Sequence, residues 1–283
     1  MGQITLDELV AKVDEIPVFP QTVLRIIKLI EDPNTGAKDV EREIIKDQGL
    51  TAKILKLANS AYYGLSRNVK TVSEATVLLG FQAVKSMVLA TSVGKVFDKE
   101  LPGYALGKEA LWRQSQVCAI TTRVVAKKAR FPKADQAYTA GLLRDIGKVI
   151  LDHYMAEQYE LIVEQVYSSK KSFLEVEQDI LGFDHGQVGA RIAEKWHLPE
   201  DLVEAIALHH TPEKAIINPK MTAMVHVADV VVMMLGLHLG IDGMSYGFSN
   251  KAIELLKLDE VALSEIMSEV ADIISDEGIY MTT

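Results

Sequence analysis

Apolar residues recur at intervals of three and four along nearly the whole chain, which is the spacing of one face of an α-helix. The repeat is clearest within residues 23–30, 54–58 and 84–91. No stretch shows sustained alternation of apolar and polar residues between turn residues, so strands are not needed to explain the pattern. The sequence therefore predicts an all-α fold.

Several helix ends can be read from capping residues. Thr5 with Glu8, and Ser172 with Glu175, form the Ser/Thr-x-x-Glu pattern of a capping box, which predicts that a helix begins at each. Gly64 closes the segment 59–64 and is predicted to be the C-cap residue of the preceding helix, because glycine adopts the left-handed conformation readily.

Three regions follow one another along the chain. Residues 1–100 are predicted to form an N-terminal helical subdomain, and residues 101–240 a second subdomain with longer helices and all seven histidines. Residues 241–283 are expected to form acidic helices that pack back on the body. Segment 98–107, with its proline and glycines, is the predicted linker, and the glycine-rich stretch 236–247 separates the last helices.

Charge and composition restrict the class of protein. Of the 283 residues, 48% are hydrophobic, as in an ordinary globular protein, and 30 Lys and Arg stand against 39 Asp and Glu, a net charge of −9. Most of the acidic excess lies within residues 241–283. A general nucleic-acid-binding surface is therefore not favoured.

The location of the protein can be predicted from three features. Residues 1–10 contain Asp7 and Glu8 where a signal peptide needs a basic and then an apolar segment. The most apolar stretch, 225–239, is too short and too often interrupted by polar residues to span a bilayer. The single cysteine, Cys118, fits a reducing compartment. We expect a cytoplasmic protein that does not bind membranes.

The residues that carry chemistry are the run Arg144–Lys148, which contains the carboxylate Asp145, and His185, the doublet His209–His210 and Asp229. Imidazole and carboxylate groups on separate helices suit zinc, iron, nickel or manganese. Each also has a structural explanation. His185 could cap a helix, the doublet could end one, and Asp229 on an apolar helix needs a polar partner.

Longer motifs surround these residues. In the second half they are Leu142–Lys148, Gly182–Gly189, Trp196–Pro199, Ala205–His210 and His226–Asp229, and in the first half Ile16–Pro20, Asp47–Leu55, Leu57–Gly64 and Glu74–Gly80. Together they resemble the HDOD family, a divergent, output-type relative of the HD-superfamily metal-dependent phosphohydrolases. The resemblance covers roughly residues 14–240 and implies an HD-like helical subdomain preceded by a helical N-terminal one.

The chain departs from the catalytic HD pattern at two ligand positions. By the resemblance, Gln114 and Arg144 stand where that pattern has histidines, so only Asp145 and Asp229 remain of the four ligands of the first metal position. A neutral amide is a poor ligand, and an arginine brings a permanent positive charge. A two-metal hydrolytic centre is therefore not expected, and no catalytic residue is assigned. Gln114, Arg144, Lys148 and Asp229 are placed in a degenerate pocket.

The resemblance also implies a second metal position, made of Asp145, His185, His209 and His210, and all four residues are present. One divalent ion (Fe, Ni, Zn or Mn) could bind there as a structural or vestigial centre. The alternative is a metal-free polar cluster in which Arg144 forks onto a carboxylate and replaces the charge of the metal.

Two functions remain open. The resemblance implies a bacterial signal-transduction protein, here a regulatory output module without hydrolase activity that acts through protein–protein contact or ligand binding. Its partner would be an unknown regulatory protein or a small ligand such as a nucleotide. The alternative is an HD-type metal-dependent phosphohydrolase that acts on a nucleotide or a cyclic dinucleotide.

A local group of basic residues also has two interpretations. It consists of Arg123, Lys127, Lys128, Arg130 and Lys133. The group could be a solvated face at the C-terminal end of a helix, where the helix dipole favours cations. It could instead bind an anion, such as a phosphate or a nucleotide.

Overall fold

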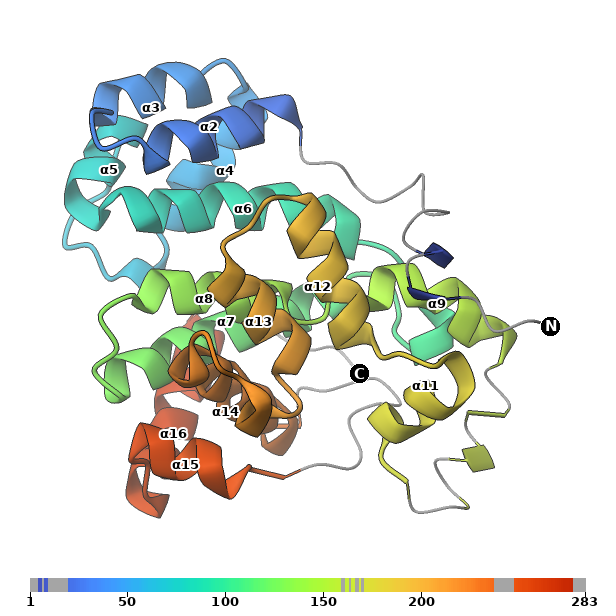
Figure 1. The fold of residues 1–283 in the computed structure, drawn as a ribbon. Coiled ribbons are helices and arrows are strands. Elements are labelled where there is room, and N and C mark those ends of the chain that lie inside the picture. The colour runs from blue at the N-terminus through green and yellow to red at the C-terminus, as the bar shows by residue number, and fades with distance from the viewer. Residues whose placement is uncertain are drawn as a thin grey trace. The chain divides into compact units, whose positions relative to one another are not determined.

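The computed structural model confirms the all-α fold (Figure 1). It describes residues 5, 6, 8, 9, 20–158, 161, 162, 164, 165, 168, 171–236 and 247–276. These residues contain α-helices, three short 3-10 helices and no strand, and Leu101 and Leu106 form an isolated bridge. The motif residues 16–19 and the glycine-rich residues 237–246 lie outside the described part.

The chain divides into two compact units, one within residues 17–96 and the other within residues 97–271. The elements of the first are α2 (Gln21–Glu31), α3 (Ala37–Ile44), α4 (Gln48–Ala58), η1 (Ala61–Tyr63), α5 (Val72–Leu79) and most of α6 (Phe81–Phe97). Helix α2 shows why they form: its apolar residues at helical spacing, Val23, Ile26, Ile27 and Ile30, are buried on one face.

The prediction that Gly64 caps a helix is wrong. Helix α4 ends at Ala58, and Asn59 is its C-cap residue. The Asn59 amide donates to the carbonyls of Leu55 and Val69 and accepts from the Val69 amide at 2.6 Å, so the side chain ends the helix and ties down the loop that follows. Gly64 comes after η1, where it has the left-handed φ of 59°.

The second unit positions the candidate site. Its elements are η2 (Pro102–Tyr104), α7 (Ala110–Lys128), α8 (Ala134–Leu143), α9 (Lys148–Glu157), α11 (Phe173–Leu181), α12 (His185–Lys195), α13 (Glu200–Leu208), η3 (Pro212–Lys214), α14 (Pro219–Met234), α15 (Asn250–Leu256) and most of α16 (Glu260–Asp276). Helix α7 packs along α8 and α14, and α12 packs against α13. The approach of α7 to α8 is close: a Cβ on Gly141 would lie 2.2 Å from Thr122 Oγ1.

Both predicted capping boxes are present. The Glu8 amide donates to Thr5 Oγ1, and the Thr5 amide donates to the Glu8 carboxylate at 2.9 Å. Ser172 and Glu175 make the same reciprocal pair at the start of α11. These bonds satisfy amides that a helix start leaves without an intrahelical partner.

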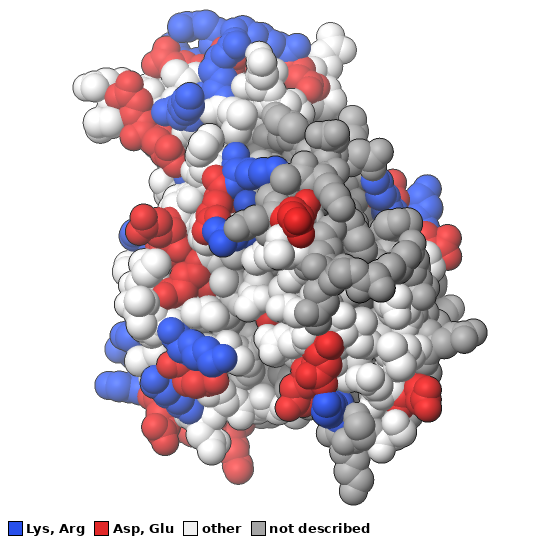
Figure 2. All heavy atoms as spheres, turned by 45° about the vertical axis from the view of Figure 1, so that its right-hand side comes forward, with Lys and Arg blue, Asp and Glu red and all other residues white. Residues whose placement is uncertain are grey.

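Two surface properties bear on the sequence predictions. Within the described chain, no helix is both long enough and apolar enough to cross a membrane. On the face drawn in Figure 2, basic and acidic side chains are interspersed.

Candidate functional site

The turn between α8 and α9 carries the first site residues, and it is held tightly against the start of α12. A Cβ on Gly147 would lie 1.9 Å from the carbonyl oxygen of His185 and 2.7 Å from the amide nitrogen of Gly189. Only glycine allows this approach, because any side chain would overlap the α12 backbone. The turn therefore delivers Arg144 and Asp145 to the first turn of α12.

Arg144 is fully buried and pairs with two carboxylates. Its Nε donates to Asp229 Oδ1 at 2.6 Å, its Nη2 lies 3.1 Å from Asp145 Oδ2, and its Nη1 donates to the Gly141 carbonyl at 3.3 Å. Burial acts to lower the pKa of Arg144, but the two carboxylates outweigh it and raise that pKa further. The guanidinium is thus a permanent cation between the two aspartates.

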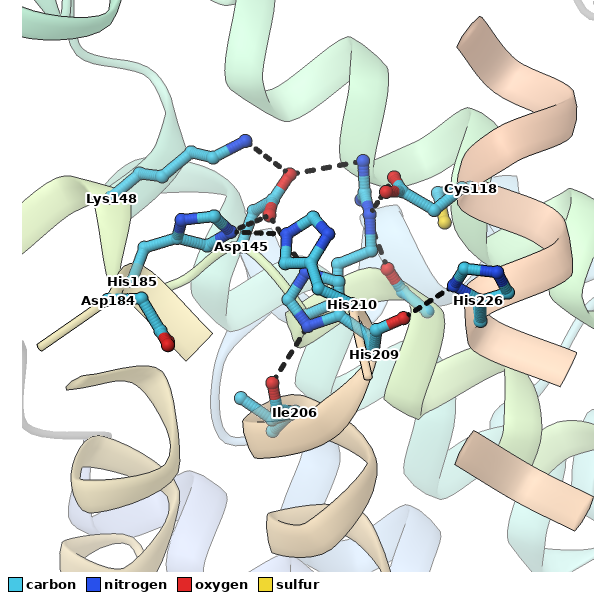
Figure 3. A network of polar contacts seen from close by, with 12 residues as sticks. Cys118, Asp145, Lys148, Asp184, His185, Ile206, His209, His210 and His226 are labelled. Atoms are coloured by element: carbon cyan, nitrogen blue, oxygen red, sulfur yellow. Dashed lines mark hydrogen bonds and ion pairs between the residues drawn. The ribbon is translucent and has the colours of Figure 1, made fainter. Parts of the chain in front are cut away.

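Asp145 divides its two oxygens between different partners. Oδ2 lies 2.9 Å from Lys148 Nζ in addition to its contact with Arg144. Oδ1 faces the imidazoles of His185 and His209, with Nε2 atoms at 3.4 and 3.6 Å (Figure 3). Burial acts to raise the pKa of Asp145, but the charges of Arg144 and Lys148 hold it well below its usual range.

His185 is oriented by a glutamate that sequence reasoning missed. Its Nδ1 lies 2.7 Å from Glu177 Oε2, its backbone amide donates to the same oxygen, and Glu177 Oε1 accepts from the Tyr104 hydroxyl at 2.6 Å. Burial acts to lower the pKa of His185, but Glu177 and Asp145 raise it to about 10. A metal-free His185 is therefore an imidazolium at neutral pH.

The capping explanation for His185 does not hold. Asp184 is the N-cap residue of α12, and its side chain accepts from the Gln187 amide at 2.8 Å. His185 occupies the first helical position, so its ring is free to face Asp145 and Glu177.

The histidine doublet follows the last residue of α13. His209 Nδ1 donates to the Ile206 carbonyl at 2.8 Å, so in a neutral ring Nε2 carries the lone pair, and this buried atom has no hydrogen-bond partner among the described residues. His210 Nε2 lies 2.9 Å from His185 Nε2. Burial, followed by electrostatic interaction with His209 and His185, lowers the pKa of His210 well below its usual range. His210 is therefore a neutral ring, and its Nε2 accepts a hydrogen bond from His185 Nε2.

Three histidines could therefore hold a metal ion. One nitrogen from each of His185, His209 and His210 lies within 4.8 Å of the others, and Asp145 Oδ1 adjoins them. The unpartnered Nε2 of His209 and the Glu177 carboxylate behind His185 both fit such a role, since metal-bound histidines are usually oriented by a second hydrogen bond.

The same network is also balanced without a metal. Its cations are Arg144, Lys148 and the protonated His185, and its carboxylates are Asp145, Glu177 and Asp229. Three positive charges therefore meet three negative charges. A divalent ion that displaced the His185 proton would leave the buried site with one excess positive charge, which is costly at low dielectric constant.

Gln114 and His226 differ in their relation to this network. Gln114 is fully buried on α7, and neither end of its amide has a hydrogen-bond partner among the described residues, so the structure does not join it to the network. His226, whose role was missed, does join it: Nδ1 donates to the His209 carbonyl at 2.9 Å, and Nε2 accepts from the Ser249 amide. It links the doublet to the start of α15.

Burial of the site is almost complete. The exposed fraction is at most 2% for Arg144, Asp145, Lys148, His185, His209 and Asp229, and only His210 is half-buried. The charged groups therefore interact mainly with one another.

A curated protein of Treponema pallidum (strain Nichols), whose name is "Uncharacterized protein", is 27% identical to this chain over 208 residues. The match covers 70% of this chain and 38% of the relative, so this chain spans well under half of that protein.

Solved structures share the fold. An HDOD domain protein from Geobacter sulfurreducens is 25% identical, with a TM-score of 0.80 and 99% of each chain covered. A candidate phosphohydrolase from Shewanella amazonensis SB2B is 24% identical (TM-score 0.73; 96% of this chain and 95% of that chain). A candidate signal transduction protein from Marinobacter aquaeolei VT8 is 23% identical (TM-score 0.72; 99% of this chain and 62% of that chain).

A family model provides the assignment. The model of the HDOD domain matches residues 16–212, which is most of the chain and includes Asp145, His185, His209 and His210. The chain belongs to the HDOD domain family.

Proposed function

We propose that the chain is a regulatory module of bacterial signal transduction that acts by binding a protein or a small ligand and does not hydrolyse phosphoesters. The observation that carries this proposal is the buried guanidinium of Arg144, which contacts Asp145 and Asp229 at once. By the family resemblance, those aspartates are what is left of the first metal position.

The arginine opposes metal binding at that position in two ways. Its charge cannot be removed by deprotonation, so a divalent ion between the same carboxylates would meet a fixed like charge. Its hydrogen bond also occupies Asp229 Oδ1, and its ion pair holds Asp145 Oδ2. Gln114 offers only a neutral amide, so it does not replace a missing histidine ligand.

Burial supports the same proposal. A phosphate ester needs donors that it can reach, yet Arg144 and Lys148 are fully buried and already paired with carboxylates. Any substrate would have to open the network and leave Asp145 without its two cations, and separating a buried ion pair costs about 3–5 kcal/mol.

The proposed setting follows from the family and the charge. The likeness to the candidate signal transduction protein from Marinobacter aquaeolei VT8 shows the shared fold and no more. The interspersed surface charges and the net charge of −9 favour a protein or a small ligand as partner over nucleic acid. We place the protein in the cytoplasm.

One observation favours the second candidate, a phosphohydrolase with a single metal ion. His185, His209, His210 and Asp145 would hold the ion, and Fe, Ni, Zn or Mn would supply a Lewis acid toward a phosphoryl group. Glu177 would hold His185 in the ligating orientation. Lys148 would remain bound to the other oxygen of Asp145.

A hydrolysis assay separates the two candidates. The full chain, purified without a metal-affinity tag, is incubated with cyclic dinucleotides, nucleotides and bis-p-nitrophenyl phosphate in the presence of each of the four metals in turn. We expect no turnover above that of Asp145→Ala. Turnover that Asp145→Ala abolishes and the exposed-surface control Glu269→Ala retains would establish the phosphohydrolase.

A further inference from the structure

A second candidate site lies apart from the ion-pair network and shares no residue with it. A pocket of about 390 Å³ is formed by the C-terminal end of α7, the first turns of α14 and the end of α15, which packs beside α14. We call it the basic pocket. Its volume lies within the range of small-molecule sites.

The polar side chains that line the basic pocket are all cationic. They are Lys128, Arg130, Lys220 and Lys257, and no acidic residue is among the lining residues. Lys128 pairs with Glu265, whereas the other three have no carboxylate within salt-bridge distance in the described part of the chain. In a protein of net charge −9, such a concentration of positive charge in a concave site favours an anion.

The helix dipole explains only part of this charge. Lys128 is in the last turn of α7, and Arg130 and Lys257 directly follow the ends of α7 and α15, where cations are favoured. Lys220 is in the first turn of α14, where the dipole disfavours a cation. Its position therefore needs another cause, and a bound anion provides one.

The backbone also positions two of the cations. Arg130 and Lys257 have left-handed φ values of 53° and 55°, at the position after a helix where glycine is usual. Each is held by the bond that ends its helix, from the Phe131 amide to the Ala126 carbonyl and from the Leu258 amide to the Ile253 carbonyl. A basic side chain is thus present at two positions whose backbone conformation disfavours any residue with a Cβ.

The rest of the lining is apolar and includes Phe131, Met224, Leu255 and Leu256. Met224 and Leu256 are buried, whereas Phe131 and Leu255 are partly exposed and offer apolar surface to a ligand. A bare inorganic anion would leave that apolar surface uncovered. A ligand that joins an anion to a flat or apolar group would contact both parts.

We propose that the basic pocket binds a phosphorylated small molecule with an aromatic or apolar group, of the class of nucleoside monophosphates. The cations would bind the phosphate, and Phe131 and the aliphatic side chains would contact the other part. The site also explains two members of the basic group in the sequence, Lys128 and Arg130, while Arg123 instead pairs with Asp135.

This site lies on the helix that reaches the network. Lys220 and Met224 line the pocket from the first two turns of α14, and His226 and Asp229 extend from the same helix to His209 and Arg144. A bound ligand would therefore contact the element that completes the buried site. Binding itself does not depend on whether the proposed regulatory function holds.

Calorimetric titration of the full chain tests the proposal. The probes are the four common 5′-nucleoside monophosphates, inorganic phosphate and the unphosphorylated nucleosides, at physiological salt. We expect at least one monophosphate to bind saturably, at least about tenfold more tightly than inorganic phosphate and its own nucleoside. Absence of binding by every monophosphate would overturn the proposal, as would phosphate alone binding equally well.

Matched variants locate the site. Arg130→Gln with Lys220→Gln removes two charges from the pocket, and we expect affinity to fall at least about tenfold because charged hydrogen bonds are lost. The control Lys127→Gln with Lys214→Gln removes two exposed charges outside the lining and should change affinity less than about twofold, since exposed charges are screened. Equal losses in both variants would overturn the site. Preference for a phosphoserine peptide over every mononucleotide would overturn the ligand class.

Discussion

Arg144 Nε donates to Asp229 Oδ1 at 2.6 Å across 85 residues of sequence, and both side chains are buried. This ion pair joins the turn after α8 to the middle of α14. Because the same guanidinium also lies 3.1 Å from Asp145 Oδ2, one cation pairs with carboxylates from two elements. The core of the second unit is therefore organised around a charge that most cores exclude.

Replacing Arg144 should destabilise the protein strongly. Arg144→Met leaves Asp145 and Asp229 without their shared cation, and breaking a buried pair costs about 3–5 kcal/mol in the free energy of unfolding. Denaturant unfolding measures the change. Arg113→Met is the control, since Arg113 pairs with Glu109 on the exposed side of α7 and such pairs contribute about 0–1 kcal/mol. Similar losses in both variants would contradict the role given to Arg144.

Gly147→Ala should also destabilise the protein. The new Cβ would meet backbone atoms of α12 at 1.9 and 2.7 Å, and backbone cannot move aside as a flexible side chain can. We expect a loss of about 3 kcal/mol, near the upper end for overpacking. Gly107→Ala, where no atom lies within 4 Å of the added Cβ, should change stability by less than about 1 kcal/mol. Equal stability of both variants would show that the turn does not lie against α12 so closely.

Stability should fall on mild acidification. Burial, opposed by the bond to the His209 carbonyl, keeps the pKa of folded His226 below the usual 6.5. Below pH 6.5 the unfolded chain takes up a proton that the folded chain does not, so the free energy of unfolding decreases as pH falls. The slope is up to about 1.4 kcal/mol per pH unit for each proton, and His210 contributes with the same sign. His185, whose pKa is raised from 6.5 to about 10, contributes with the opposite sign above pH 6.5 and little below it, so the fall in stability is expected below that pH.

The variant His226→Asn isolates that contribution. Denaturant titrations between about pH 7 and 5, where most carboxylates remain ionised, should give a smaller slope for the variant than for the parent chain. Both are measured with a chelator present. An unchanged slope would mean that His226 does not resist protonation in the folded protein.

Cys118 should be inert in the folded protein. It is fully buried on α7, and burial raises the pKa of its thiol to about 12, so the reactive thiolate is scarce at neutral pH. A thiol reagent at pH 8 should label the chain only after denaturant is added. Rapid labelling of the native chain would contradict the packing of α7 against α8 and α14.

The helices could be predicted from the sequence because apolar spacing and capping residues act locally. The capping box at Ser172 depends on residues only three apart. The end of α4 was misplaced because Asn59 bonds to Val69, ten residues away, and this contact outweighs the local preference of Gly64. Tertiary hydrogen bonds of this kind leave no periodic signal.

The candidate site was only partly predictable. The residues Asp145, His185, His209 and His210 were identified as carboxylate and imidazole groups, and the family resemblance joined them into one metal position. The partners of Arg144 come from elements far apart in sequence. Glu177 was missed although it occupies the buried stripe of α11 with Phe173, Val176 and Leu181. A carboxylate on an apolar stripe needs a buried partner, and that was the available signal.

We propose that a balanced set of ion pairs takes the place of a metal, and elemental analysis tests this proposal most directly. The full chain is purified without a metal-affinity tag, beside Asp145→Ala and the exposed control Glu269→Ala. We expect far less than one transition-metal ion per chain in all three proteins. One ion per chain in the parent and in Glu269→Ala, lost in Asp145→Ala, would contradict it and show that the histidines hold a metal.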